Sequence, residues 1–167
     1  MPDLQLPLTR SLGDSDSEEA VELRRRSARE SFPNARNPEA AQAALLLLHG
    51  CWEASHDLIN DNETPEACYV HAIVHRIEPN PGNSAYWFRQ LGDHPLFAQL
   101  HQRAQEILHE HPVLGWELKS KWDPYLFNQW CEEARRAPGS DKEKAAVAIQ
   151  QAEWELLFAW CAVPLGG

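Results

Sequence analysis

The chain has 167 residues, of which 43% are apolar and 24% are charged, and both figures are typical of one globular domain. Its formal net charge of −10 opposes binding to nucleic acid or to anionic lipid, because both depend on clustered basic residues. The sequence shows no apolar run long enough to span a membrane and no leader pattern, so we expect a soluble, cytoplasmic protein.

Residues 1–36 are predicted to form a mobile, acidic segment at the amino terminus. Proline and glycine interrupt its first half, which shows no hydrophobic periodicity. The spacing from Ser15 to Glu18 matches a capping box and predicts a short polar helix that ends near Glu30. This helix has too little apolar surface to dock firmly, so we expect a single domain over residues 37–164.

The domain is predicted to begin with a helical hairpin. Asn37 can cap a helix whose first residue is Pro38, since proline lacks the amide proton that would stay unpaired at that position. This helix is expected to end at His49. Gly50 suits the left-handed conformation that follows many helices, and a shorter helix is expected over residues 52–60.

A second hairpin follows the same design. The Thr-Pro pair at 64–65 predicts a helix that continues to about Arg76, and the proline-rich turn over 79–82 ends it. Asn83 is expected to cap the next helix, which closes at Gly92.

The two hairpins suggest an internal repeat. Gly50 and Gly82, each with alanine a few residues later, give a period of about 32 residues, which loosely resembles tetratricopeptide repeats over residues 38–92. Strand-like alternation is absent from the sequence. We therefore predict an all-α fold whose hairpins close into a compact bundle, with later helices over 95–110, 124–136 and 141–162.

Histidine residues mark the first candidate site. His71 and His75 are four residues apart, so both imidazoles lie on one helix face, about 5–6 Å apart at Cβ. This spacing suits two ligands of one divalent transition metal ion. His56 and Glu53, which share a face of the preceding helix, are candidates for the remaining ligands.

Other ligands are also open at this point: Cys68 lies on the His71 stripe, and Glu78 and His49 are near in sequence. The spacing of two histidines is not specific, because it arises often by chance in a chain with eight of them. A histidine that borders an apolar face is more often a hydrogen-bonded structural residue than a ligand, and this alternative stays open.

A second polar cluster is expected at the turn of the second hairpin. Its members are Arg76, Glu78, Asn83, Tyr86, Trp87 and Arg89. Arginine offers a planar fork for a carboxylate or phosphate, and tyrosine and tryptophan add flat surfaces, so this cluster suits a small anionic molecule or a peptide. The structural alternative is that Trp87 packs the hairpin, Asn83 only caps a helix, and Arg76 pairs with Glu78.

Three functional hypotheses follow. The first is a binding module that presents the Arg76, Tyr86, Trp87 and Arg89 surface to an anion or a peptide. The second is a metal-dependent enzyme in which His71 and His75 bind the metal with His56 or Glu53, and Arg76 orients an anionic substrate. The third is a structural subunit whose tryptophans pack against a partner or form a homo-oligomer.

Two motifs carry a resemblance. HAIVHR over residues 71–76 and GNSAYWFR over residues 82–89, together with the Trp-Asp-Pro run at 122–124, resemble an uncharacterised family of bacterial proteins across most of residues 40–160. The resemblance implies that the polar residues gathered in these motifs form a site. It implies no particular activity, substrate or cofactor.

Overall fold

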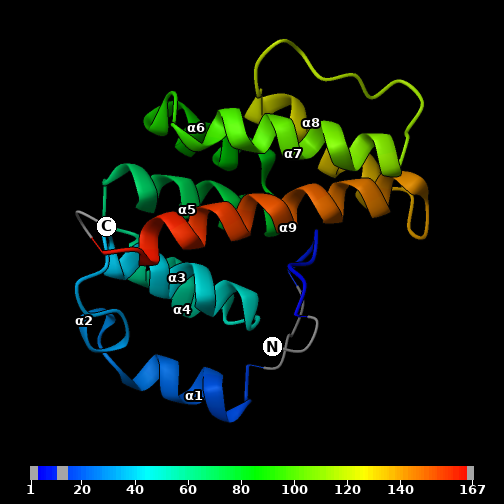
Figure 1. Ribbon diagram of the computed structural model, residues 1–167. Helices are drawn as coiled ribbons and strands as arrows, with labels where there is room; N and C mark the ends of the chain where they lie inside the picture. The colour runs from blue at the N-terminus through cyan, green and yellow to red at the C-terminus, as the bar shows by residue number, and fades with distance from the viewer. Residues whose placement is uncertain (1–3, 11–14, 165–167) are drawn as a thin grey trace.

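A computed structural model of the protein describes residues 4–10 and 15–164. Within these ranges the chain forms nine α-helices and no β-strand, which confirms the predicted all-α class. The helices are α1 (Glu18–Arg25), α2 (Ala28–Ser31), α3 (Pro38–Leu48), α4 (Trp52–Ile59), α5 (Pro65–Ile77), α6 (Pro81–Leu91), α7 (Leu96–Glu110), α8 (Pro124–Arg135) and α9 (Asp141–Ala162), as Figure 1 shows. None of these helices combines the length and the apolar character needed to cross a lipid bilayer.

Most helix starts follow the predicted caps. The side chains of Asn37, Thr64 and Ser140 each accept a hydrogen bond from a backbone N–H in the first turn of α3, α5 and α9. The prediction for α6 was wrong. This helix begins at Pro81 with Asn80 as its cap, because an Asn-Pro pair starts a helix here just as it does in α3, and Asn83 lies inside the first turn.

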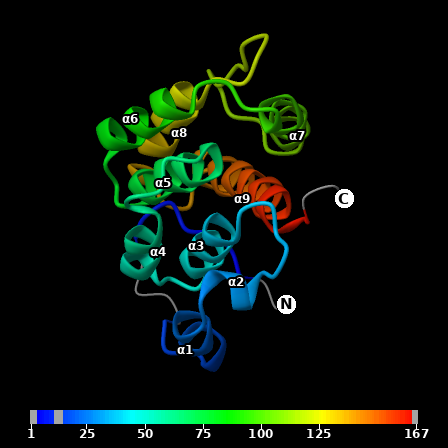
Figure 2. The same cartoon turned by 90° about the vertical axis from the view of Figure 1, so that its left-hand side faces the viewer.

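Helix α5 is the centre of the molecule. All eleven of its residues from Ala67 to Ile77 are buried. It packs most extensively against α6 and also contacts α3, α4 and α9, and Figure 2 shows these helices arranged around it. A helix that is enclosed on every side has no solvated face. Its polar residues must therefore find partners within the protein.

The two hairpins are held by equivalent hydrogen bonds. In the first, Ser55 Oγ on α4 donates to the Ala43 carbonyl on α3 over 2.7 Å. In the second, Ser84 Oγ on α6 donates to the Ala72 carbonyl on α5, also over 2.7 Å. The serine and the alanine of the second hairpin each lie 29 positions after their counterparts in the first.

This spacing corrects the predicted period of about 32 residues. Gly50 lies between α3 and α4 with a φ of 76°, whereas Gly82 lies within the first turn of α6, so the two glycines are not structurally equivalent. Aligning these two glycines gave the wrong repeat period, because a glycine before a helix and a glycine inside a helix cannot be told apart in the sequence. The resemblance to tetratricopeptide repeats stays a prediction.

Part of the amino-terminal segment packs against the core. Leu6 and Leu8 are buried in the main core, and Gln150 Nε2 donates to the Leu6 and Pro7 carbonyls. Alternate apolar residues on extended chain place their side chains on one side, a pattern that a search for helical periodicity misses. This packing was not predicted from the sequence, and residues 1–3 and 11–14 lie outside the described parts.

Helices α1 and α2 also replace the single polar helix expected from Ser15. Ser17, not Ser15, caps α1, and a capping box between Ser27 and Glu30 starts α2. Ala20 and Leu23 of α1 pack with Leu46 and Cys51 in a second, smaller apolar cluster. The mobility predicted for residues 1–36, and the domain boundary at 37, stay predictions.

Candidate metal centre

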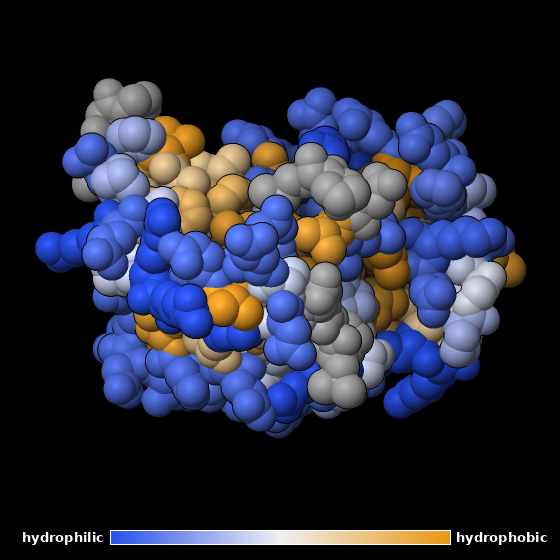
Figure 3. Space-filling model, turned by 90° about the horizontal axis from the view of Figure 1, so that it is seen from below, coloured by the Kyte–Doolittle hydropathy of each residue, from blue (hydrophilic) through white to orange (hydrophobic). Residues whose placement is uncertain are grey.

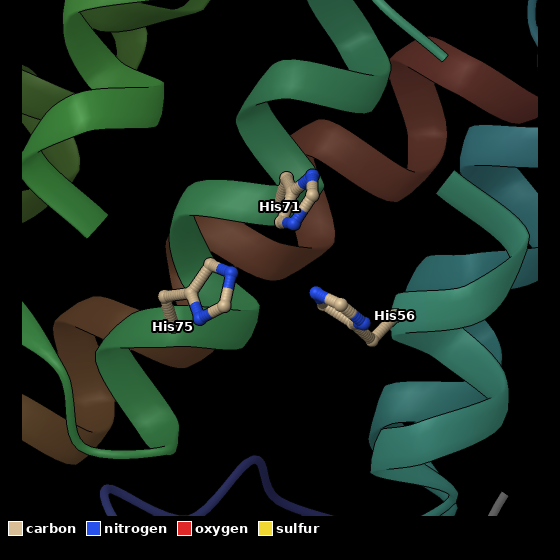
Figure 4. A group of neighbouring side chains, drawn as sticks. All are labelled: His56, His71 and His75. Carbon is tan, nitrogen blue, oxygen red and sulfur yellow. The ribbon is translucent and has the colours of Figure 1, made fainter. Parts of the chain in front are cut away.

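Three histidines from two neighbouring helices face one another. His56 projects from α4, while His71 and His75 project from adjacent turns of α5, and Figure 4 shows one nitrogen of each ring pointing toward the other two rings. The ring centroids are 4.8 Å apart for His56 and His71, 5.2 Å for His56 and His75, and 4.9 Å for His71 and His75. One potential ligand atom from each residue lies within 4.8 Å of the others.

This arrangement approaches the dimensions of a metal site. Nitrogen atoms bound to a tetrahedral zinc ion at about 2.0–2.1 Å are about 3.3 Å from one another. The widest separation in the cluster, 4.8 Å, must therefore close by about 1.5 Å for a metal to bind. The His56 side chain is 24% exposed, so it has more freedom to rotate inward than the two buried rings of α5.

Burial keeps the two rings on α5 neutral. His71 and His75 are 1% and 5% exposed. Burial, together with the neighbouring His75 and His56, lowers the pKa of His71 to about 3. Burial also lowers the pKa of His75, against the opposing effect of Glu78. Neutral imidazole is the form that binds metal ions, so neither ring has to lose a proton at pH 7 before it binds.

Aromatic side chains hold two of the rings in place. The indole of Trp52 stacks on His56 at 5.1 Å between centroids, and its Nε1 donates to the Val74 carbonyl on α5. On the opposite side, Trp87 of α6 stacks on His71 at 3.9 Å. The cluster thus lies between two tryptophans, and His71 Nδ1 has no hydrogen-bond partner among the described residues although it is buried.

Polar contacts hold the third ring. His75 Nδ1 lies 2.7 Å from Glu78 Oε2, and Asn83 Nδ2 lies 3.2 Å from His75 Nε2 and 3.4 Å from His75 Nδ1. A carboxylate that orients a histidine is a regular feature of protein metal sites. The cluster therefore has both candidate ligands and groups that position them.

The other predicted ligands do not join the cluster. Glu53 is exposed and forms an ion pair of 2.9 Å with Arg10, so it points away from the three rings. Cys68 and His49 are buried, but neither belongs to the group of ligand atoms around His71. Of the two alternatives given for the third ligand, His56 or Glu53, the structure brings only His56 into position.

The predicted anion surface is not formed as one unit. Arg76 is fully buried; its Nε donates to Asn128 Oδ1 over 2.8 Å, and its guanidinium is paired with Glu153 of α9. The predicted pair of Arg76 with Glu78 is wrong, because Glu78 lies on the side of α5 that faces His75. Arg76 therefore contributes no charge to the surface of the turn.

The remaining members of that cluster divide between two places. Glu78, Asn83 and Trp87 belong to the surroundings of the histidines. Tyr86 and Arg89 are exposed on the outer side of α6. Two groups that looked separate in sequence, the histidines and part of the turn, thus form one site.

Sequence reasoning missed Trp52 as a member of the site, and Asn128 and Glu153 as partners of Arg76. Trp52 lies four residues before His56, a spacing that places both rings on one face of α4 and could have indicated the contact. Glu153 lies 77 residues from Arg76, and no local pattern connects them.

An open groove lies away from the histidines. It measures about 670 Å³ and runs between the amino-terminal segment, α3 and α9, with a lining of Leu4, Gln5, Leu45, Leu48, Gln151, Trp154, Glu155 and Phe158. Figure 3 shows the apolar groups of the face that carries α1 as separate patches in a hydrophilic surface. Four of the seven tryptophans are buried and three are partly buried, so they do not form the exposed packing surface that the structural hypothesis requires.

Comparison of the chain with protein-family models, with curated proteins and with solved structures gives no match. The chemistry of the cluster follows from its side chains. Imidazole ligands suit zinc, copper, iron and nickel ions. Three protein ligands leave a tetrahedral ion one position for water or for a substrate.

Proposed function

We propose that the protein binds one divalent transition metal ion through His56, His71 and His75. The observation that carries this proposal is the convergence of three imidazoles from α4 and α5, with ligand atoms within 4.8 Å of one another. Burial of the two α5 rings in their neutral form, and the stacking of Trp52 and Trp87, support it. Zinc is the preferred ion because it accepts tetrahedral sites with neutral nitrogen ligands.

A metal-dependent enzyme is the second candidate, and the number of ligands favours it. Catalytic zinc sites use three protein ligands and keep one position open, whereas structural sites use four. When bound there, the ion would supply a Lewis acid and an activated water. The role of substrate anchor suggested for Arg76 is not retained, since Glu153 and Asn128 occupy its guanidinium. The same contacts weaken the anion-binding hypothesis, which keeps only Tyr86 and Arg89 on the surface.

Elemental analysis of the untagged protein, produced in medium that contains zinc, manganese and iron, tests the proposal. We expect close to one metal ion per chain in the parent protein and none in the double variant His71→Ala with His75→Ala. Replacement of the exposed His109 and His111 by alanine is the matched control and should leave the metal content unchanged. Far-UV circular dichroism should show similar helical content in all three proteins.

Two results would count against metal binding. A parent protein that contains no metal, and that gains none when titrated with Zn²⁺ or Co²⁺, would exclude it. Loss of helical structure in the double variant, together with a metal-free parent, would show that both histidines serve the fold alone.

A further inference from the structure

The contact between Glu78 and His75 determines which ring nitrogen carries the proton. His75 Nδ1 lies 2.7 Å from Glu78 Oε2, and an ionised carboxylate can only accept a hydrogen bond. The proton of neutral His75 is therefore on Nδ1, and the lone pair is on Nε2. Glu78 can make this contact because it follows His75 by three residues at the end of α5, where both side chains share a face.

We propose that Glu78 is the positioning residue of this site: it holds His75 in the Nδ1–H tautomer, with the Nε2 lone pair directed at His56 and His71. The effect on metal affinity rests on the metal binding proposed above, whereas the tautomer is a property of the metal-free protein. Glu78 is not a ligand in this proposal. It acts through the ring that it orients, as carboxylates do behind the histidines of many metal sites.

Asn83 also contacts this ring. Its Nδ2 lies 3.2 Å from His75 Nε2 and 3.4 Å from His75 Nδ1. A group at nearly the same distance from both ring nitrogens lies over or beside the ring, because the Nε2 lone pair points away from Nδ1. Asn83 therefore packs against the ring and leaves the Nε2 lone pair free for a metal ion.

The other two rings have no equivalent carboxylate contact of hydrogen-bond length among the described residues. His71 and His56 are held by stacking on Trp87 and Trp52, which fixes the plane of a ring but not the position of its proton. The closest carboxylate to His56 is that of Asp57, at 3.9 Å from Nδ1. His75 is thus the ring whose tautomer is determined by the protein, and replacing Glu78 should affect this ring first.

Nitrogen-15 NMR of the metal-free protein, with histidine labelled, tests the tautomer directly. We expect the Nδ1–H form of His75 in the parent and in Glu78→Gln, whose amide oxygen still accepts. In Glu78→Ala the ring should shift to the Nε2–H form that free histidine prefers. Glu78 is partly exposed, so its loss should leave the circular dichroism spectrum unchanged. An Nε2–H tautomer in the parent, or no change in Glu78→Ala, would overturn the proposal.

Titration with Zn²⁺ tests the consequence for affinity. The dissociation constant should rise roughly 10- to 100-fold in Glu78→Ala and less in Glu78→Gln. The control Glu53→Gln, an exposed carboxylate that pairs with Arg10, should leave it unchanged. Unchanged affinity in Glu78→Ala would exclude the positioning role, while a parent that binds no zinc would exclude the metal site and leave the NMR result to decide on Glu78 alone.

Discussion

Arg76 and Glu153 form an ion pair inside the core, where their side chains are 1% and 0% exposed. Burial opposes the charge on Arg76, but the charge and hydrogen bond of Glu153 outweigh it, so the pKa of Arg76 is raised overall. The Tyr69 hydroxyl donates to the same carboxylate, and burial together with Glu153 raises the pKa of Tyr69. The pair therefore belongs to a closed network in which each polar group depends on the others.

Removing one charge of the buried ion pair should strongly lower the stability of the protein. Arg76→Met leaves Glu153 charged and unpaired in the core, and we expect the free energy of unfolding to fall by about 3–5 kcal/mol. Arg76→Met combined with Glu153→Leu removes both charges and should be more stable than Arg76→Met alone. Urea unfolding followed by circular dichroism measures the difference.

The exposed pair of Arg103 and Glu155, 3.8 Å apart, provides the control for that experiment. Arg103→Met should change the stability by less than about 1 kcal/mol, because solvent screens the pair. The single variant Glu153→Leu completes the comparison. If the loss in free energy of unfolding of the double variant equalled the sum of the losses of Arg76→Met and Glu153→Leu, the two residues would act independently and the network would be refuted.

At the scale of helices, the hydrogen bonds of Ser55 and Ser84 hold each hairpin together, but they are not equal. Ser55 Oγ makes one hydrogen bond, to the Ala43 carbonyl. Ser84 Oγ donates to the Ala72 carbonyl and also accepts a hydrogen bond from Asn128 Nδ2. The other side-chain atom of Asn128, Oδ1, accepts a hydrogen bond from Arg76 Nε. Ser84 therefore connects the second hairpin to α8 and to the buried ion pair.

This difference predicts unequal costs for the same substitution. Ser55→Ala should lower the free energy of unfolding by about 1 kcal/mol, the value of one hydrogen bond. Ser84→Ala should cost more, about 2–3 kcal/mol, because a buried amide proton of Asn128 loses its acceptor. Chemical unfolding of the two variants side by side checks the order, and equal losses would show that Asn128 finds another acceptor.

Helix boundaries were largely predictable from sequence, since caps such as Thr64 and Asp123 act through neighbouring residues. Two of the three candidate ligands were predictable for the same reason: His71 and His75 share a face because they are four residues apart. The contribution of His56 was one of two alternatives, and packing of α4 on α5 decided it. The burial of Arg76 was not predictable, because its partner lies on α9 and only tertiary contacts bring them together.

At the scale of the whole molecule, the amino-terminal segment closes the core. Leu6 is completely buried, its backbone N–H donates to Gln151, and the Arg10 N–H donates to the Ile77 carbonyl at the end of α5. The Arg10 guanidinium lies 4.4 Å from the centre of the Trp52 ring. The segment thus extends from the α9 surface to the edge of the histidine cluster.

If this segment is part of the folded unit, Leu6→Ala should behave as a core substitution. We expect a loss of about 2–5 kcal/mol in the free energy of unfolding, from lost burial and the cavity that remains. Leu114→Ala, at a position that is 100% exposed, is the matched control and should change stability by less than about 0.5 kcal/mol. If Leu6→Ala and Leu114→Ala changed the free energy of unfolding by the same small amount, the amino-terminal segment would contribute nothing to stability, as expected of the mobile segment that the sequence predicts.

The equivalent serine hydrogen bonds also suggest how this architecture can be recognised in other chains. Each bond joins a serine hydroxyl to the carbonyl of a fully buried alanine twelve positions earlier. A backbone carbonyl accepts in the same way whatever side chain its residue carries, but only a small side chain lets the two helices come close enough. A diagnostic pattern for such hairpins is therefore a small residue, eleven positions of any kind and a serine, repeated at intervals of 29, and glycine positions are a poorer guide.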